Sequence, residues 1–255
     1  MLNANVNGIR LAYERHGNGI PALLIHGHPL DHSIWTPVIP LLAHEFDLIL
    51  PDLRGFGESE TVSGSYLLDN MAADLLALLD HLKVSQVLIA GHSMGGYVAL
   101  AIARVQPGRI RGLGLVASQV FADPPERKVA RYETAAGIEK DGVGGMANTF
   151  PAKLSADLAL LPALGAIIRR QSPHGVAESL RAIAERPDSS DLLKQLTCPV
   201  ALIHGKADQL IPVERARQAH ELAPRSSLVE IEGAGHMAMM EAPEETSRAL
   251  KGMLR

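Results

Sequence analysis

The 255-residue sequence has a single cysteine, no long apolar run and no excess of positive charge. Because Cys198 has no second cysteine to pair with, an extracellular scaffold held by disulfides within the chain is excluded. Lys and Arg total 24 against 28 Asp and Glu, so we expect no nucleic-acid-binding surface. No apolar stretch approaches the ~20 residues that cross a bilayer, and the N-terminus lacks the features of a secretory signal. We therefore expect a soluble, cytoplasmic protein that binds neither nucleic acid nor membrane.

The composition is that of a folded globular protein, with 47% apolar residues, 20% charged residues and a formal net charge of -4. A disordered chain would carry fewer apolar residues and a stronger charge imbalance. At this length we expect one α/β core with room for an inserted subdomain, as a monomer or a homodimer.

Short aliphatic runs that end at Gly, Pro or Asp alternate with stretches of helical period, which predicts strands covered on both faces. Asp69 or Asn70 is placed to cap a helix whose apolar residues recur at three- and four-residue spacing as far as Leu82. An antiparallel hairpin that turns at Asn7-Gly8 is expected to open the chain. The alternation implies a parallel sheet with right-handed crossovers and helices on both sides. The predicted core strands are 22–25, 48–50, 87–90, 110–117, 200–203 and 227–231.

Residues 120–190 interrupt this pattern, because they contain no comparable aliphatic strand and repeated prolines separate short helical pieces. We expect a helical insertion at 120–190 between two parts of the core, 1–119 and 191–255. The predicted helices outside the first crossover are 97–105, 158–170, 176–185, 213–222 and 243–254.

The strongest signal for chemistry is Gly91-His92-Ser93-Met94-Gly95-Gly96, which follows the strand at 87–90 and precedes a helix. A nucleophile elbow requires this context. Its glycines remove Cβ atoms that would collide with the neighbouring strand and helix, and the serine is held exposed in a strained conformation. Ser93 is therefore predicted to be a nucleophile.

A serine nucleophile needs a base, and the base needs an orienting acid. His236 directly follows the last predicted strand, within Gly233-Ala234-Gly235-His236, and Asp208 follows the strand before it. Both positions are at strand carboxyl ends, where open α/β sheets bind ligands. We predict His236 as the base and Asp208 as the acid, with Asp123, which follows the strand at 110–117, as the alternative acid.

Attack on a carbonyl produces an oxyanion, which backbone amides fixed in advance can stabilise. One such amide is predicted to be that of Met94, at the start of the helix after the nucleophile. The other should come from the loop His26-Gly27-His28-Pro29, and we assign it to the amide of His28.

Taken together, these motifs resemble the α/β-hydrolase superfamily over nearly the full length of the chain. The resemblance implies a mostly parallel eight-stranded sheet flanked by helices, a helical cap at 120–190 that roofs the active site, and no need for a cofactor. It is carried, in order, by His26-Gly27-His28-Pro29, Pro51-Asp52-Leu53-Arg54-Gly55-Phe56-Gly57-Glu58-Ser59, Gly91-His92-Ser93-Met94-Gly95-Gly96, His204-Gly205-Lys206-Ala207-Asp208 and Gly233-Ala234-Gly235-His236.

His28 departs from the family pattern, because similar enzymes often have a large apolar side chain at this position. Its imidazole either simply projects into the pocket or orients a polar substrate. The serine at position 93 weakens any resemblance to haloalkane dehalogenases, which use an aspartate there. The absence of a Gly-Gly-Gly run after His26 speaks against esterases of the hormone-sensitive-lipase type.

Two other constellations do not develop into binding sites. His26, His28 and His32 share one loop, but no cluster of Asp, Glu or Cys accompanies them, so no metal site is predicted. Gly55-Phe56-Gly57 has Glu60 where a dinucleotide-binding loop has its third glycine.

The sequence thus predicts a cofactor-independent serine hydrolase that cleaves a small carboxylic ester or lactone through an acyl-enzyme on Ser93. Enol-lactone hydrolysis, hydrolysis of carbon–carbon bonds in ring-cleavage products and cofactor-free perhydrolysis use the same triad and remain alternatives. An alternative of another class is a non-catalytic small-molecule receptor on the same fold.

Overall fold

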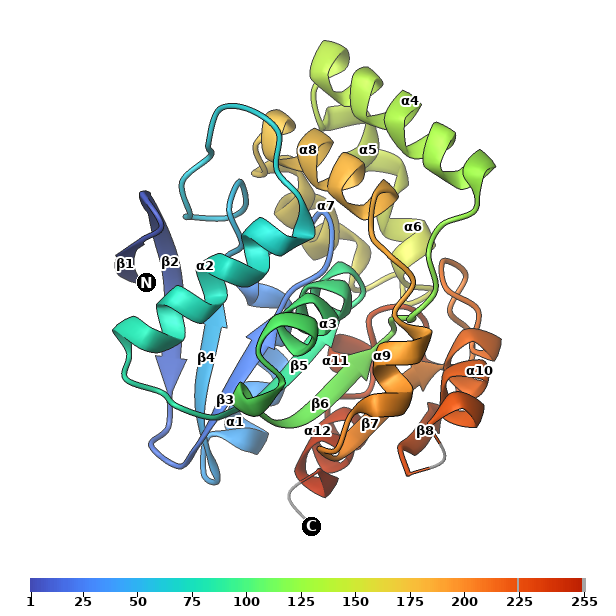
Figure 1. The fold of residues 1–255 in the computed structure, drawn as a ribbon. Coiled ribbons are helices and arrows are strands. Elements are labelled where there is room, and N and C mark those ends of the chain that lie inside the picture. Colours follow the sequence, from blue (N-terminus) through green and yellow to red (C-terminus); the bar gives the residue numbers. More distant parts are fainter. Residues whose placement is uncertain (224, 254–255) are drawn as a thin grey trace.

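The computed structural model of the protein describes residues 1–223 and 225–253, and one eight-stranded sheet forms its centre (Figure 1). The order across the sheet is β1-β2-β4-β3-β5-β6-β7-β8. β1 and β2 form the expected hairpin at Asn7-Gly8, β2 runs antiparallel to both neighbours, and the other neighbouring pairs are parallel. The prediction of a mostly parallel eight-stranded sheet is confirmed. The strands are β1 (Leu2–Val6), β2 (Ile9–His16), β3 (Ile20–Ile25), β4 (Phe46–Pro51), β5 (Val87–His92), β6 (Ile110–Val116), β7 (Val200–Gly205) and β8 (Ser227–Ile231).

Helices cover both faces of the sheet, and each face has its own apolar core. Side chains of β3 alternate between the two cores, with Leu23 and Ile25 in one and Ala22 and Leu24 in the other. Burial on both faces explains the unbroken aliphatic runs of the strands. One face carries α2 (Leu68–His81), α3 (Met94–Val105), α9 (Ser190–Gln195) and α10 (Glu214–Leu222); the other carries the 3-10 helix η1 (His32–Val38), α1 (Ile39–Leu42), α11 (Ala238–Glu241) and α12 (Pro243–Gly252). The short 3-10 helix η2 (Pro107–Arg109) leads into β6.

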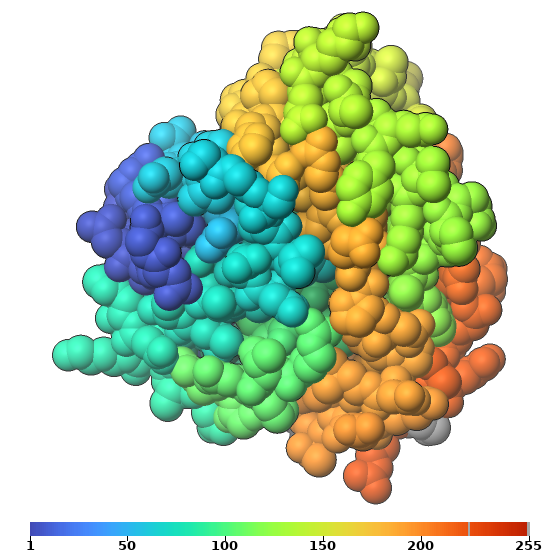
Figure 2. Space-filling model, turned by 45° about the horizontal axis from the view of Figure 1, so that its top comes forward, coloured from blue at the N-terminus to red at the C-terminus, as the bar shows by residue number. Residues whose placement is uncertain are grey.

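A group of helices follows β6 and lies beyond the carboxyl ends of the parallel strands, at the top of Figure 1. These are α4 (Pro125–Asp141), α5 (Gly144–Thr149), α6 (Pro151–Leu154), α7 (Leu161–Arg169) and α8 (Pro173–Ala184), with α4 packed along α8. The segment after β4, cyan in Figure 2, adjoins the orange part of this helical group. There the Tyr66 hydroxyl donates to the Gly175 carbonyl at 3.0 Å, and the Gly57 amide donates to Gln171 Oε1 at 2.8 Å.

The structure corrects two expectations about helices. The 17-residue α4 was not predicted, because it buries only Ala135 and Ile138 and so has no apolar stripe to read. The start of α2 is at Leu68, so neither Asp69 nor Asn70 is its N-cap. Asn70 instead lies in the first turn, where its side chain accepts a hydrogen bond from the Leu67 amide at 2.8 Å.

The last helix begins at the predicted position, Pro243, whereas its predicted end at Leu254 lies outside the described residues. None of the helices in the described ranges is long and apolar enough to cross a membrane.

Candidate active site

Ser93 lies at the sharp turn between β5 and α3, with φ 51° and ψ -114°. Residues other than glycine rarely adopt a positive φ, so the backbone of this turn is strained. A Cβ added at Gly91 would lie 2.2 Å from the carbonyl oxygen of Gly95, and one added at Gly95 would lie 2.4 Å from that of Ile25. The Ser93 amide donates to the Val116 carbonyl at 2.9 Å, which ties the turn to β6. The two glycines are therefore required by the close approach of backbone to backbone.

His236 and Asp208 approach each other from the loops that follow β8 and β7. His236 Nδ1 lies 2.7 Å from Asp208 Oδ2, and both residues are buried. His236 and Ser93 line the same cavity. The structure thus brings the predicted base against the predicted acid, and it brings the predicted base and nucleophile to one cavity.

The surroundings of Asp208 keep its carboxylate ionised. Burial by itself raises the pKa of a carboxyl, but His236, His204 and the Ile211 amide outweigh it and hold the pKa of Asp208 well below its ordinary value. The other oxygen, Oδ1, accepts from the amides of Leu210 and Ile211 at 2.8 and 3.0 Å. An ionised carboxylate can only accept a hydrogen bond, so Nδ1 of His236 carries the proton in this contact with Asp208. In the tautomer that this contact selects, Nε2 is the nitrogen that can accept a proton.

The alternative acid, Asp123, lies in a different environment. Its carboxylate pairs with Arg186 at 2.7 Å, with Arg131 and, at 3.7 Å, with Arg127. Among the described residues it makes no hydrogen bond to His236. The imidazole of His236 is therefore hydrogen-bonded to Asp208, whereas Asp123 lies within a cluster of arginines.

The amides of His28 and Met94, predicted as oxyanion donors, follow β3 and begin α3. Neither amide donates to another group in the described part of the chain. The loop that carries His28 is fixed by His26, whose Nε2 accepts a hydrogen bond from the Leu53 amide at 3.0 Å. Unpaired amides on a fixed backbone are what stabilisation of an oxyanion requires.

The side chain of His28 is buried and neutral. Its Nδ1 lies 2.8 Å from Ser179 Oγ, and the Ser179 hydroxyl donates to the Val176 carbonyl at 2.8 Å. Both bonds form together only if Nδ1 carries the proton, since the hydroxyl has a single hydrogen to donate. Burial, reinforced by the charge of Arg131, lowers the pKa of His28 to about 3. The side chain therefore fixes the loop on α8 as an uncharged donor.

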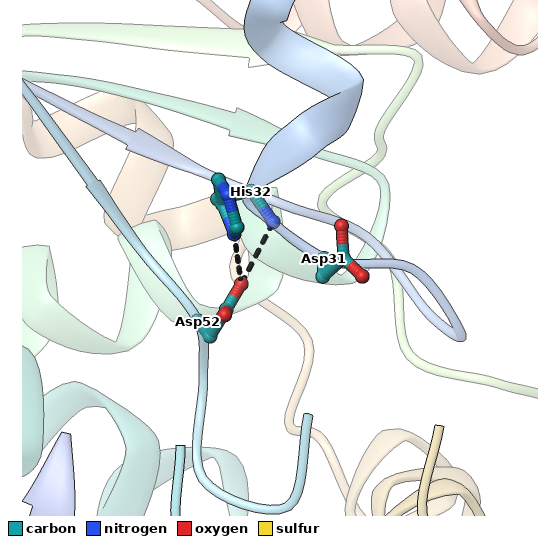
Figure 3. Close-up of side chains that lie close together, drawn as sticks. All are labelled: Asp31, His32 and Asp52. Carbon is teal, nitrogen blue, oxygen red and sulfur yellow. Dashed lines mark hydrogen bonds and ion pairs between the residues drawn. The ribbon is translucent and has the colours of Figure 1, made fainter. Parts of the chain in front are cut away.

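Among the residues that the structure describes, two groups of His, Asp and Glu lie close enough together to be considered as metal ligands. In the first, shown in Figure 3, His32 Nδ1 and the His32 amide both point to Asp52 Oδ1, at 2.7 and 2.9 Å. The nearby Asp31 pairs instead with Arg170 at 2.7 Å. Protein donors thus already satisfy both carboxylates, and this group does not support a metal centre.

The second group joins Glu139 of α4 to His174 and Glu178 of α8. Arg181 donates to both carboxylates, at 2.6 Å in the case of Glu139 Oε2. Its guanidinium thus supplies positive charge to both carboxylates, while His174 Nε2 and Glu178 Oε2 are buried without a hydrogen-bond partner in the described part of the chain.

The cavity that contains Ser93 and His236 has a volume of about 590 Å³ and includes residues that the sequence did not single out. Its apolar wall includes Ile138, Phe150 and Leu180, which gives space for a carbon chain. Its charged wall consists of cations from α4 and α6. No sequence signal marked these cations, because their helices have no motif and α4 was not predicted. They are Arg127, Arg131 and Lys153.

Comparisons with known proteins identify the family and the fold of the chain. The model of a family described as "Alpha/beta hydrolase family" matches residues 22–249. A malate-bound thermophilic esterase from Thermogutta terrifontis is 36% identical with a TM-score of 0.94, and the match covers 100% of this chain and 97% of that one. The enol-lactonase from Burkholderia xenovorans LB400 is 24% identical with a TM-score of 0.91 over 99% of both chains, which shows the same fold. The dihydrolipoyllysine-residue acetyltransferase component of the acetoin cleaving system of Pseudomonas putida is 32% identical over 264 residues, 99% of this chain and 68% of that protein.

Proposed function

This chain belongs to the alpha/beta hydrolase family, and from that premise we propose that it is a serine hydrolase that cleaves a small carboxylic ester or lactone. One observation carries the proposal: His236, hydrogen-bonded to Asp208 at 2.7 Å, lines one cavity with the strained Ser93. A serine that shares a cavity with a hydrogen-bonded histidine and aspartate is suited to acyl transfer.

In the proposed reaction, Ser93 Oγ attacks the carbonyl carbon while His236 Nε2 accepts its proton. The amides of His28 and Met94 bind the oxyanion that forms. His236 then returns the proton to the leaving alcohol, and the acyl group remains on Ser93 as an ester. A water molecule, deprotonated by His236, releases the acid and restores the serine. Asp208 keeps the imidazole in the required tautomer throughout.

We propose that residues 120–190 act as the cap over this site. In support, α4, α5, α6 and α8 contribute residues to the cavity that contains Ser93. The volume of about 590 Å³ lies in the range of roughly 300–1,000 Å³ that small-molecule sites occupy. The mixture of apolar and cationic walls suits a substrate with a carbon chain and a polar end.

The test is a kinetic comparison of wild type, Ser93→Ala and Ser85→Ala on a panel of 4-nitrophenyl esters and lactones. Loss of Ser93 should lower kcat by at least about 10³-fold while thermal unfolding stays cooperative. Ser85 is exposed on a distant loop and controls for serine replacement as such. Wild-type turnover of no ester or lactone, or full turnover by Ser93→Ala, would overturn the proposal. Retained ligand binding without turnover in the wild type would favour the receptor alternative.

A further inference from the structure

The charged side chains on the cavity wall all have one sign. Arg127, Arg131 and Lys153 line the cavity, and no Asp or Glu of the described residues does. Lys153 forms no ion pair within the described ranges. A cavity with cations on one wall and an apolar surface beside them is suited to a ligand that has an anionic end.

Arg131 is the most specific of the three, because its donors are only partly used. Its side chain is 17% exposed, and it donates to Asp123 through Nε. The two terminal nitrogens, Nη1 and Nη2, donate to no group in the described part of the chain, and neither is a fully buried atom. A guanidinium held by Nε presents this terminal pair in the fork geometry that matches both oxygens of a carboxylate.

The neighbouring carboxylate does not cancel this positive charge. Asp123 is the only acid that pairs with Arg131 among the described residues, and it also pairs with Arg186 at 2.7 Å and with Arg127 at 3.7 Å. One negative charge is thus shared among three guanidinium groups. The surplus charge lies close to the reacting centre, since Arg131 is near enough to His28 to help lower the pKa of that imidazole.

We propose that Arg131, assisted by Arg127, is a carboxylate subsite, so that the preferred substrate is an ester or lactone that carries a free carboxylate away from the scissile carbonyl. The inference rests on the proposed hydrolysis at Ser93 and deepens it by naming the substrate class. The carboxylate accepts hydrogen bonds from Nη1 and Nη2, while the carbon chain lies against the apolar wall and the carbonyl reaches Ser93.

The first experiment compares charged substrates with neutral partners of the same length. Mono-4-nitrophenyl esters of glutarate, adipate and suberate place the carboxylate in the acyl part, and the methyl-capped forms remove its charge. Acetylated hydroxy acids and their methyl esters do the same for the alcohol part. For at least one length, kcat/KM should favour the charged member by on the order of 10- to 100-fold, as expected for hydrogen bonds to a charged group. Raising the ionic strength should reduce that ratio.

The second experiment assigns the preference to Arg131. Arg131→Gln should abolish the preference for the charged ester, chiefly by raising KM for that ester, and should change KM for the neutral ester much less. Arg131→Lys should restore part of the preference. Lys128→Gln is the matched control, since Lys128 lies on the same helix, pairs with Glu185 and does not line the cavity. Equal rates for charged and neutral members at every length, or a preference that survives Arg131→Gln, would overturn the subsite.

Binding separates this proposal from the proposed hydrolysis. Adipate titrated calorimetrically into Ser93→Ala should bind, and adding Arg131→Gln should weaken it by at least about tenfold. If wild type hydrolyses no ester but adipate binds through Arg131, the subsite stands and the hydrolysis fails. If esters are hydrolysed but adipate binds equally with and without Arg131, the hydrolysis stands and the subsite fails.

Discussion

The neutral, buried imidazole of His28 predicts a specific pH dependence of stability. In the folded protein, burial lowers the pKa of His28 to about 3, whereas in an unfolded chain it has the ordinary value of 6.5. Between these pH values the unfolded chain binds a proton at this position and the folded protein does not. Acid therefore favours unfolding: the penalty is absent well above pH 6.5 and grows as the pH falls toward 3.

The size of the effect follows from the two pKa values. Between pH 7 and pH 5, protonation of the unfolded chain at His28 should cost about 2 kcal/mol of folding stability. His28→Leu removes the titrating group and puts an apolar side chain of similar size in its place. The Ser179 hydroxyl keeps its hydrogen bond to Val176 in this variant. The replacement itself changes the free energy of unfolding at pH 7. The informative quantity is therefore how the difference in unfolding free energy between wild type and variant changes from pH 7 to pH 5.

The assay is urea unfolding of wild type and His28→Leu at pH 7 and pH 5, followed by circular dichroism. Wild type should lose about 2 kcal/mol more than the variant over this interval. The pKa values of His26 and His92 are also lowered by burial, but these residues are present in both proteins and cancel in the comparison. Equal losses in the two proteins would show that the folded protein does not hold His28 in its neutral form.

Two substitution pairs test the assembly of the site. Asp208→Asn should lower kcat by on the order of 10⁴-fold in a folded protein. Asp123→Asn should lower kcat far less and should chiefly lower the unfolding midpoint. Similar losses of kcat for the two variants in steady-state assays would contradict the assignment of Asp208 as the acid. Gly95→Ala puts a Cβ 2.4 Å from the Ile25 carbonyl oxygen and should lower both the melting temperature and activity, while Gly145→Ala, which has open space on a helix, should be neutral or slightly stabilising. Thermal melts of both variants distinguish these outcomes, and a normal melt for Gly95→Ala would show that the elbow tolerates the added atom.

Sequence patterns alone located the core strands and the opening hairpin, and they placed the three predicted site residues just after strands. Ser93, Asp208 and His236 each follow a short aliphatic run closely, and parallel strands bring their carboxyl ends to one edge of a sheet. Small glycine motifs mark these loops because the backbones approach too closely for a Cβ, as at Gly91 and Gly95. For these residues, the local sequence pattern is therefore enough to predict the position in the fold.

The helices of residues 120–190 could not be predicted in the same way. α4 buries only Ala135 and Ile138 along its length, so its helical state depends on packing against α8 more than on an apolar stripe. The contact between His28 and Ser179 joins residues 151 positions apart, which no local pattern announces. Arg131 was not singled out from the sequence, because no local pattern shows that its side chain lines the cavity.

The proposed reaction requires a covalent acyl intermediate on Ser93, which a phosphorylating reagent can trap in a stable form. Diethyl 4-nitrophenyl phosphate mimics the tetrahedral centre and is attacked by an activated serine. Intact-protein mass spectrometry should show one diethylphosphoryl group per chain, and peptide mapping should place it on Ser93. The adduct should be absent from Ser93→Ala and form much more slowly in His236→Ala. An unmodified wild-type protein that still hydrolyses esters, or an adduct on another residue, would show that the acyl group is not carried by Ser93.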